Sequence, residues 1–169
     1  MTASPSVQSS HDRLLPAPLD LVWALHTDVE HWPDWHPLVL TAERLDSGPL
    51  AAGAQFRWTT PVPPSPLGPE DTMVVTSTVE EISQDDTAVR RVRWSGPGAG
   101  DWIRVDSGVH LWTFTQVEGG TQVHTEETWA GDLVSTAAPV ATAALAGSLE
   151  AWLDFLAAEA VRRLPGSAA

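Results

Sequence analysis

The chain has 169 residues, a formal net charge of −13 and no cysteine. The length predicts one domain with a sizeable core, and the acidic charge argues against a nucleic-acid or anionic-membrane partner. Disulfides, thiolate metal sites and cysteine nucleophiles are excluded. The sequence also lacks lysine and tyrosine, so proton transfer has to use Asp, Glu or His, with Arg or backbone donors stabilising charge.

The N-terminal segment MTASPSVQSS has neither the basic nor the apolar region of a signal peptide. No uncharged run is long and apolar enough to span a bilayer comfortably. We therefore expect a cytoplasmic protein without a membrane partner, as a monomer or a homodimer. The expected organisation is a flexible N-terminus over residues 1–10, one domain over 11–165 and a tail over 166–169.

The predicted elements begin with a weak strand over residues 7–15. Pro18 then stands where a helix can start, and LDLVWALHTD has apolar residues at helical spacing. Asp28 can cap a second short helix, VEHWPDW, that ends near Pro37. The pattern next changes to the alternation of strands, with six expected at 38–45, 54–60, 72–83, 88–94, 110–117 and 121–131.

Turn signals separate these strands. A proline-rich surface loop is expected over residues 61–71, and GPGAGD at 96–101 should break the chain. A two-residue turn at Asp85–Asp86 would place Val79 opposite Val92. A turn at Gly119–Gly120 would place Trp112 opposite Glu127 and His110 opposite Trp129, with the large aromatic side chains on one face.

The last segment, residues 135–164, predicts a long helix. Ser135 or Thr136 can cap it, and Pro139 is tolerable in its first turn. Its apolar stripe consists of Leu145, Leu149, Trp152, Leu153, Leu156 and Ala160.

One strand, two short helices, six strands and a long terminal helix is the order of the helix-grip fold. The chain resembles the START-like (SRPBCC) superfamily, in its polyketide cyclase/dehydratase-like branch, from about His11 to Leu164. The residues that carry the resemblance are APLDLVWALHTDVEHWPDWHP, AAGAQFRW and HLWTFTQVEGGTQVHTEETWAG. It implies an α+β fold in which a curved seven-stranded antiparallel sheet grips the helix around an apolar cavity. The loop over 61–71 is longer than usual for this group and is either a lid or decoration.

Glu127 is the first candidate for catalysis, because it shares a strand face with Val123 and Trp129. A carboxylate facing a cavity is desolvated, which raises its pKa and suits it to proton transfer next to a carbonyl. The alternatives are that it caps a backbone group, or that Glu126 faces inward instead.

His110 falls on the same face and is the second catalytic candidate, as an acid to the base Glu127; a satisfied core histidine is an equally good interpretation. Asp106 shares this parity and is expected near the cavity mouth, unless a bulge at Gly108 turns it away.

The other expected ligand contacts are mostly aromatic. Flat apolar walls suit an aromatic or polycyclic ligand, although core packing explains the same residues. Arg90 is interpreted as a rim ion pair opposite Glu81, or alternatively as a clamp for a substrate carboxylate. The full set of substrate-binding candidates is Trp58, Trp94, Trp112, Phe114, Trp129, Ser77, Phe56, Asp106, Arg90 and Trp152.

A metal site is disfavoured. His26, His31 and His36 are evenly spaced, but the interleaved Trp32 and Trp35 and the break at Pro33 do not put three imidazoles on one face. We therefore expect no metal and no cofactor.

Two functions remain open. The first is a cofactor-independent cyclase or dehydratase for a hydrophobic, polyketide-like or aromatic substrate, with Glu127 and His110 transferring protons. The second is a carrier or sensor that binds a hydrophobic metabolite without changing it.

Overall fold

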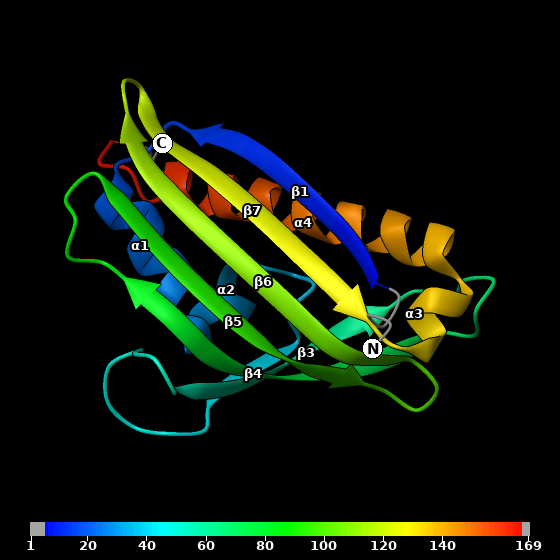
Figure 1. Cartoon of the computed structure of the whole chain (residues 1–169). Coiled ribbons are helices and arrows are strands. Elements are labelled where there is room, and N and C mark those ends of the chain that lie inside the picture. Colours follow the sequence, from blue (N-terminus) through cyan, green and yellow to red (C-terminus); the bar gives the residue numbers. More distant parts are fainter. Residues whose placement is uncertain (1–5, 167–169) are drawn as a thin grey trace.

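The computed structural model describes residues 6–166 and contains one antiparallel sheet of seven strands in the order β1-β7-β6-β5-β4-β3-β2 (Figure 1). This is the α+β helix-grip fold that the resemblance implied. The strands are β1 (Ser6–Leu15), β2 (Thr41–Arg44), β3 (Gln55–Val62), β4 (Asp71–Ser83), β5 (Val89–Ala99), β6 (Arg104–Val117) and β7 (Gly120–Ala130).

The helices cover one face of this sheet. In Figure 1 the long helix α4 (Ala138–Arg162) lies behind the sheet. At one end lie α1 (Leu19–Thr27), the 3₁₀ turn η1 (Val29–His31) and α2 (Trp32–Trp35), and α3 (Asp132–Thr136) lies at the other. The space between sheet and helices therefore holds both the core and any cavity.

Several strands extend beyond their predicted bounds, and β6 already begins at Arg104 instead of His110. β1 begins at Ser6, so residues 6–10 belong to the sheet and not to a flexible N-terminus. β5 continues through the glycine-rich segment to Ala99, and the chain turns only afterwards. The reason is a close approach of β4: a Cβ on Gly96 would lie 1.8 Å from the carbonyl oxygen of Thr76. Glycine keeps the ladder continuous there instead of breaking it.

The predicted helix caps are wrong. Asp28 precedes η1 but makes no capping hydrogen bond, and its Oδ1 lies 2.9 Å from Nδ1 of His31. The C-terminal segment forms α3 and then α4, with no side-chain cap on α4. The Ser135 and Thr136 hydroxyls donate to carbonyl oxygens of Gly131 and Asp132, 2.8 Å away in each case, because both residues already lie inside α3.

The predicted register between β6 and β7 is wrong by two residues. Glu118 and Gly119 form the turn, so Val117 pairs with Gly120 and His110 lies directly opposite Glu127. Because two is the period of side chains in a strand, the shift leaves the side chains of residues 110–117 and 121–130 on their predicted faces.

The register between β4 and β5 also differs from the prediction. Residues 84–88 form a longer connection than a two-residue turn, and Val79 pairs with Trp94. A bulge between Val79 and Glu81 then displaces Glu80 from the ladder. The outward carboxylate of Glu80 lies 2.9 Å from Nε of Arg93, so opposite charges pair on the outer face.

The core is anchored by α4. Its side chains Leu145, Leu149, Leu153 and Leu156 are almost completely buried, which follows the predicted stripe. By length and mean hydropathy, 1.3 over its most apolar window, α4 would be long enough to cross a membrane. In the fold its apolar stripe instead packs against the inner face of the sheet.

Candidate functional site

A cavity of about 350 Å³ lies between α4 and the concave face of the sheet. Six of the predicted site residues line it: Glu127, His110, Trp58, Trp94, Trp129 and Trp152. Most of the remaining lining consists of apolar side chains and glycines. An apolar cavity with a few polar groups is the usual form of a small-molecule site.

Glu127 is placed at this cavity by the alternation of β7, and its side chain is only 17% exposed. The indole Nε1 of Trp129, two residues along the strand, donates a 2.8 Å hydrogen bond to Oε1. Oε2 lies 3.4 Å from Nδ1 of His110 on the neighbouring strand. The carboxyl group is thus held from two sides and faces the cavity, and Glu126 is not its replacement.

His110 is buried and fixed by β6 and β7 together. Its Nε2 lies 2.8 Å from the hydroxyl of Thr125, while Nδ1 is directed to Glu127. A hydroxyl both donates and accepts hydrogen bonds. Thr125 can therefore satisfy His110 in either neutral tautomer. When Nδ1 carries the ring proton and donates to ionised Glu127, Nε2 accepts from Thr125; when Nε2 carries it and donates to Thr125, Nδ1 accepts from protonated Glu127.

The protonation of this pair follows from its burial. Loss of water raises the pKa of Glu127 to about 7, and the hydrogen bond from Trp129 opposes the rise only in part. Burial, with a smaller contribution from His26, lowers the pKa of His110 well below its usual value. Near neutral pH the imidazole is uncharged and the carboxyl group can either accept or return a proton.

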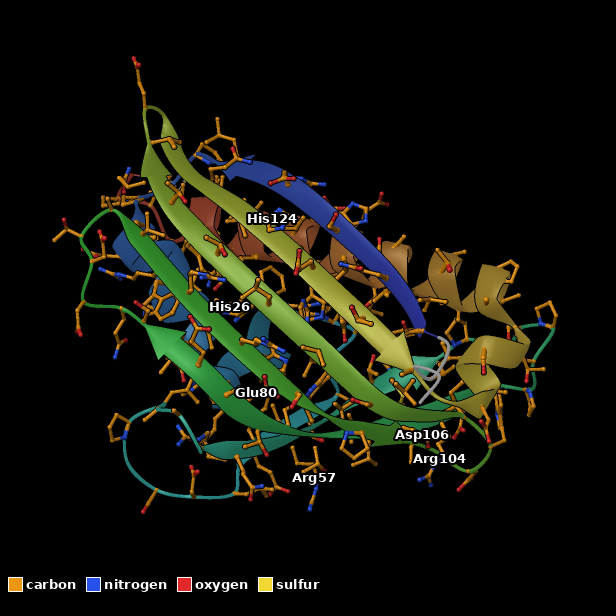
Figure 2. The ribbon with its side chains drawn as sticks, viewed as in Figure 1. His26, Arg57, Glu80, Arg104, Asp106 and His124 are labelled. Carbon is orange, nitrogen blue, oxygen red and sulfur yellow. The ribbon has the colours of Figure 1, made fainter. Side chains whose placement is uncertain are left out.

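Four predicted ligand contacts lie instead in the packed core: Phe56, Ser77, Trp112 and Phe114, all nearly or fully buried. Trp112 and Phe114 share the inner face of β6 with His110. The ring of His26 from α1 covers them, however, at centroid distances of 4.5 and 4.9 Å. In Figure 2, His26 lies behind the sheet, on the side of the helices. Residues on the same inner face of β6 therefore differ in role by their position along the strand: His110 lines the cavity, while Trp112 and Phe114, further along, belong to the core.

Asp106 lies outside the cavity. Two residues of β6, Asp106 and Ser107, occupy the irregularity opposite Pro97, between the pairs Gly98–Val105 and Gly96–Gly108. The strand parity therefore inverts, as the alternative of a bulge near Gly108 foresaw. Asp106 accepts a 2.5 Å hydrogen bond from Nε of Arg104, and Figure 2 shows both residues at the end of the sheet.

Arg90 forms an ion pair, but not with Glu81. Its guanidinium contacts Asp20 of α1 at 2.5 Å and lies 5.9 Å from the ring centre of Trp23. The register of β4 and β5 pairs Glu81 with Arg93, and it is Arg91, not Arg90, whose guanidinium lies 3.9 Å from the Glu81 carboxylate. Arg90 does not line the cavity, so it is no clamp for a ligand bound there.

The loop expected over 61–71 is shorter than predicted, because β3 continues through Pro61 and Val62 and β4 begins at Asp71. Pro61 and Val62 border the cavity from the strand, and Pro63 borders it from the loop. Further along, Gly68 packs against the indole of Trp102, where a Cβ would come within 2.8 Å of the ring. The loop is thus held against the body of the protein, and its first residue, Pro63, forms part of the cavity wall.

Several lining residues were not predicted as ligand contacts. Trp32, His36 and Leu38 contribute from α2 and the segment after it, and Thr60 contributes from β3. On α4, Ala144, Gly147 and Ser148 also line the cavity, at the spacing of one helix face. Three small residues close together on this helix, beside its leucine stripe, were the available signal, because they leave room beneath the helix.

The three evenly spaced histidines do not converge. His26 is buried in the core, His31 is exposed beside Asp28, and His36 lines the cavity. Within residues 6–166, no three His, Cys, Asp or Glu side chains lie close enough together to hold a metal ion.

Comparison with known proteins gives a match to a protein family over most of the chain. The model of a family described as polyketide cyclase/dehydrase and lipid transport matches residues 6–161. No curated protein matches the chain in sequence.

Solved structures with the same fold include enzymes. The ZhuI aromatase/cyclase from Streptomyces sp. R1128 is 20% identical, with a TM-score of 0.69 over 97% of this chain and 99% of that one. A norcoclaurine synthase point mutant from Thalictrum flavum is 14% identical, with a TM-score of 0.63 over 96% and 98%. A START superfamily protein from Mycobacterium smegmatis is 12% identical, with a TM-score of 0.70 over 94% and 99%. At these identities the likeness shows the shared fold.

Proposed function

The chain belongs to the polyketide cyclase/dehydrase and lipid transport family, and we propose that it is a cyclase or dehydratase acting on a hydrophobic, aromatic or polyketide-like substrate. The observation that carries the proposal is the buried carboxyl group of Glu127, held by Trp129 and His110 at the wall of an apolar cavity. A general base is most effective when its pKa lies near the working pH, and burial raises the pKa of Glu127 to about 7.

The proposed chemistry is one proton transfer in each direction. Ionised Glu127 takes a proton from a carbon next to a substrate carbonyl, and the resulting enolate carbon attacks a second carbonyl of the same molecule. The protonated carboxyl group then returns the proton to the new alkoxide oxygen. Loss of water, where it follows, removes that hydroxyl group with a further hydrogen from the neighbouring carbon.

His110 has a positioning role in this scheme. Its uncharged ring sits between Thr125 and Glu127, so it orients the carboxyl group and accommodates either proton position. The cavity walls contribute by holding the two reacting carbons together.

Proton abstraction can be tested without the natural substrate. 2-Tetralone, an apolar bicyclic ketone, exchanges the hydrogens next to its carbonyl for deuterium in D₂O. We expect the protein to accelerate this exchange, with a rate that rises through about pH 7 as Glu127 ionises. A positioned base contributes about 10²- to 10⁴-fold, so Glu127→Gln should lose an acceleration of that order. The matched control, Glu126→Gln, lies next along the strand with its side chain on the outer face.

The second candidate is a carrier or sensor, which the predominantly apolar lining favours. Native mass spectrometry after incubation with host extract distinguishes the two. Release of a dehydrated or isomerised molecule by the wild type, with the unchanged molecule held by Glu127→Gln, supports catalysis. The same unchanged molecule on both proteins supports a carrier, and a Glu127→Gln variant with full exchange activity removes Glu127 as the base.

A further inference from the structure

The walls of the cavity combine five indole rings with one carboxyl group. The rings belong to Trp32 of α2, Trp58 of β3, Trp94 of β5, Trp129 of β7 and Trp152 of α4. Hydrophobic packing alone does not require indoles at five separate elements. Their concentration around one cavity is the observation to be explained.

Three of these rings stand nearly perpendicular to one another. Trp32 and Trp58 have centroids 6.3 Å apart at an interplanar angle of 88°, and Trp32 and Trp152 are 4.9 Å apart at 79°. Trp58 and Trp152 complete the set at 6.1 Å and 85°. At these distances the three rings pack edge to face against one another, and Trp32 is fully buried, so no ligand group lies between them. Trp58 and Trp129 are only half-buried and line the cavity, and the negative face of an indole ring attracts a cation.

The charges in the lining favour the same ligand. Besides Glu127, the titratable side chains in the lining are His36 and His110. Burial lowers the pKa of His36 to about 4 and that of His110 well below its usual value, so both are uncharged at neutral pH. Among the described residues no arginine lines the cavity, and the chain has no lysine. Ionised Glu127 is then the one full charge of the wall.

We propose that the cavity selects a ligand with an apolar, aromatic body and a cationic ammonium group, which lies against the indole rings of Trp58 and Trp129 and is attracted by the Glu127 carboxylate. The inference rests on the proposed function in that it concerns the same cavity and names the ligand class. A bound cation favours the ionised form of Glu127, which is the form that accepts a proton. The net charge of −13 also attracts cations from solution and disfavours anions.

The test uses two probes of the same shape. Naphthalen-2-ylmethyl-trimethylammonium carries a permanent charge that no pH change removes, and 2-neopentylnaphthalene has carbon in place of the nitrogen. Their affinities are measured by tryptophan fluorescence or calorimetry at about pH 5.5 and 8.5, a range in which Glu127 ionises and the two lining histidines remain uncharged. 2-Naphthylacetate serves as the anionic comparison.

We expect the preference for the cation over its neutral isostere to rise about tenfold between the two pH values. A charge pair about 8 to 10 Å apart at an effective dielectric constant of about 20 is worth a factor of this order, after some loss of hydration. In Glu127→Gln the preference should be smaller and independent of pH. The outward-facing control Glu126→Gln should keep the wild-type increase, and the anion should bind weakest.

Two results would overturn the proposal. One is a cation that binds no better than its isostere at about pH 8.5; the other is a pH-dependent preference that survives in Glu127→Gln. Neither result bears on proton abstraction, because 2-tetralone carries no charge. A failure of the ligand class and a failure of the proposed function are therefore separately visible.

Discussion

Replacing Glu127 by Gln should change how the stability of the protein depends on pH. The pKa of this carboxyl group is about 7 in the folded chain and 4.5 in an exposed reference state. Between these values the folded protein keeps a proton that the unfolded chain has lost. Folded stability therefore falls as pH rises through this window, and it stays low above pH 7.

The size of the effect follows from the two pKa values. For one group shifted from 4.5 to about 7, linkage gives a loss of about 2.5 kcal/mol between about pH 5 and pH 8.5. Gln does not ionise and has almost the same shape, so its variant lacks this loss. His110 is present in both proteins, so the comparison removes one ionisable group, Glu127.

Urea unfolding of both proteins at the two pH values measures this difference directly. Relative to the wild type, Glu127→Gln should gain about 2 to 3 kcal/mol as pH rises from about 5 to 8.5. Glu126→Gln, measured in parallel, shows the effect of removing one negative charge from the outer face of the same strand. A difference between wild type and Glu127→Gln that does not change with pH would mean that the carboxyl group is solvated in the folded protein, and the reasoning would fail.

Three further predictions concern neighbouring features. The 2.8 Å hydrogen bond from Trp129 lowers the pKa of the Glu127 carboxyl group. Trp129→Phe removes this bond and so raises that pKa, and the pH profile of ketone exchange should move up by about one pH unit. Leu149→Ala empties a fully buried position of α4 and should cost about 3 kcal/mol in urea unfolding; a cost near zero would mean that α4 does not pack as described. Gly147→Ala meets no atom within 4 Å, so it should stabilise the helix by about 0.5 to 1 kcal/mol in thermal unfolding while it narrows the cavity; destabilisation would place Gly147 in a tighter environment.

The candidate site shows how far strand periodicity reaches. Glu127, His110 and Trp129 face inward as alternation predicts, and the two-residue error in register did not disturb this. The same rule placed Asp106 on the inner face. It failed there because a local irregularity inverted the parity, and alternation carries no information about where such irregularities fall.

The sequence by itself determined the order of the elements, the apolar faces and the restriction of proton transfer to Asp, Glu and His. These properties follow from local periodicity and from which residue types are present. Only the tertiary structure decided that His110 lies directly opposite Glu127, and that His26 seals Trp112 and Phe114 into the core. It also brought His36 and the small residues of α4 to the cavity. These contacts depend on how α1 and α4 pack across the sheet, between segments far apart in the chain, which no local pattern encodes.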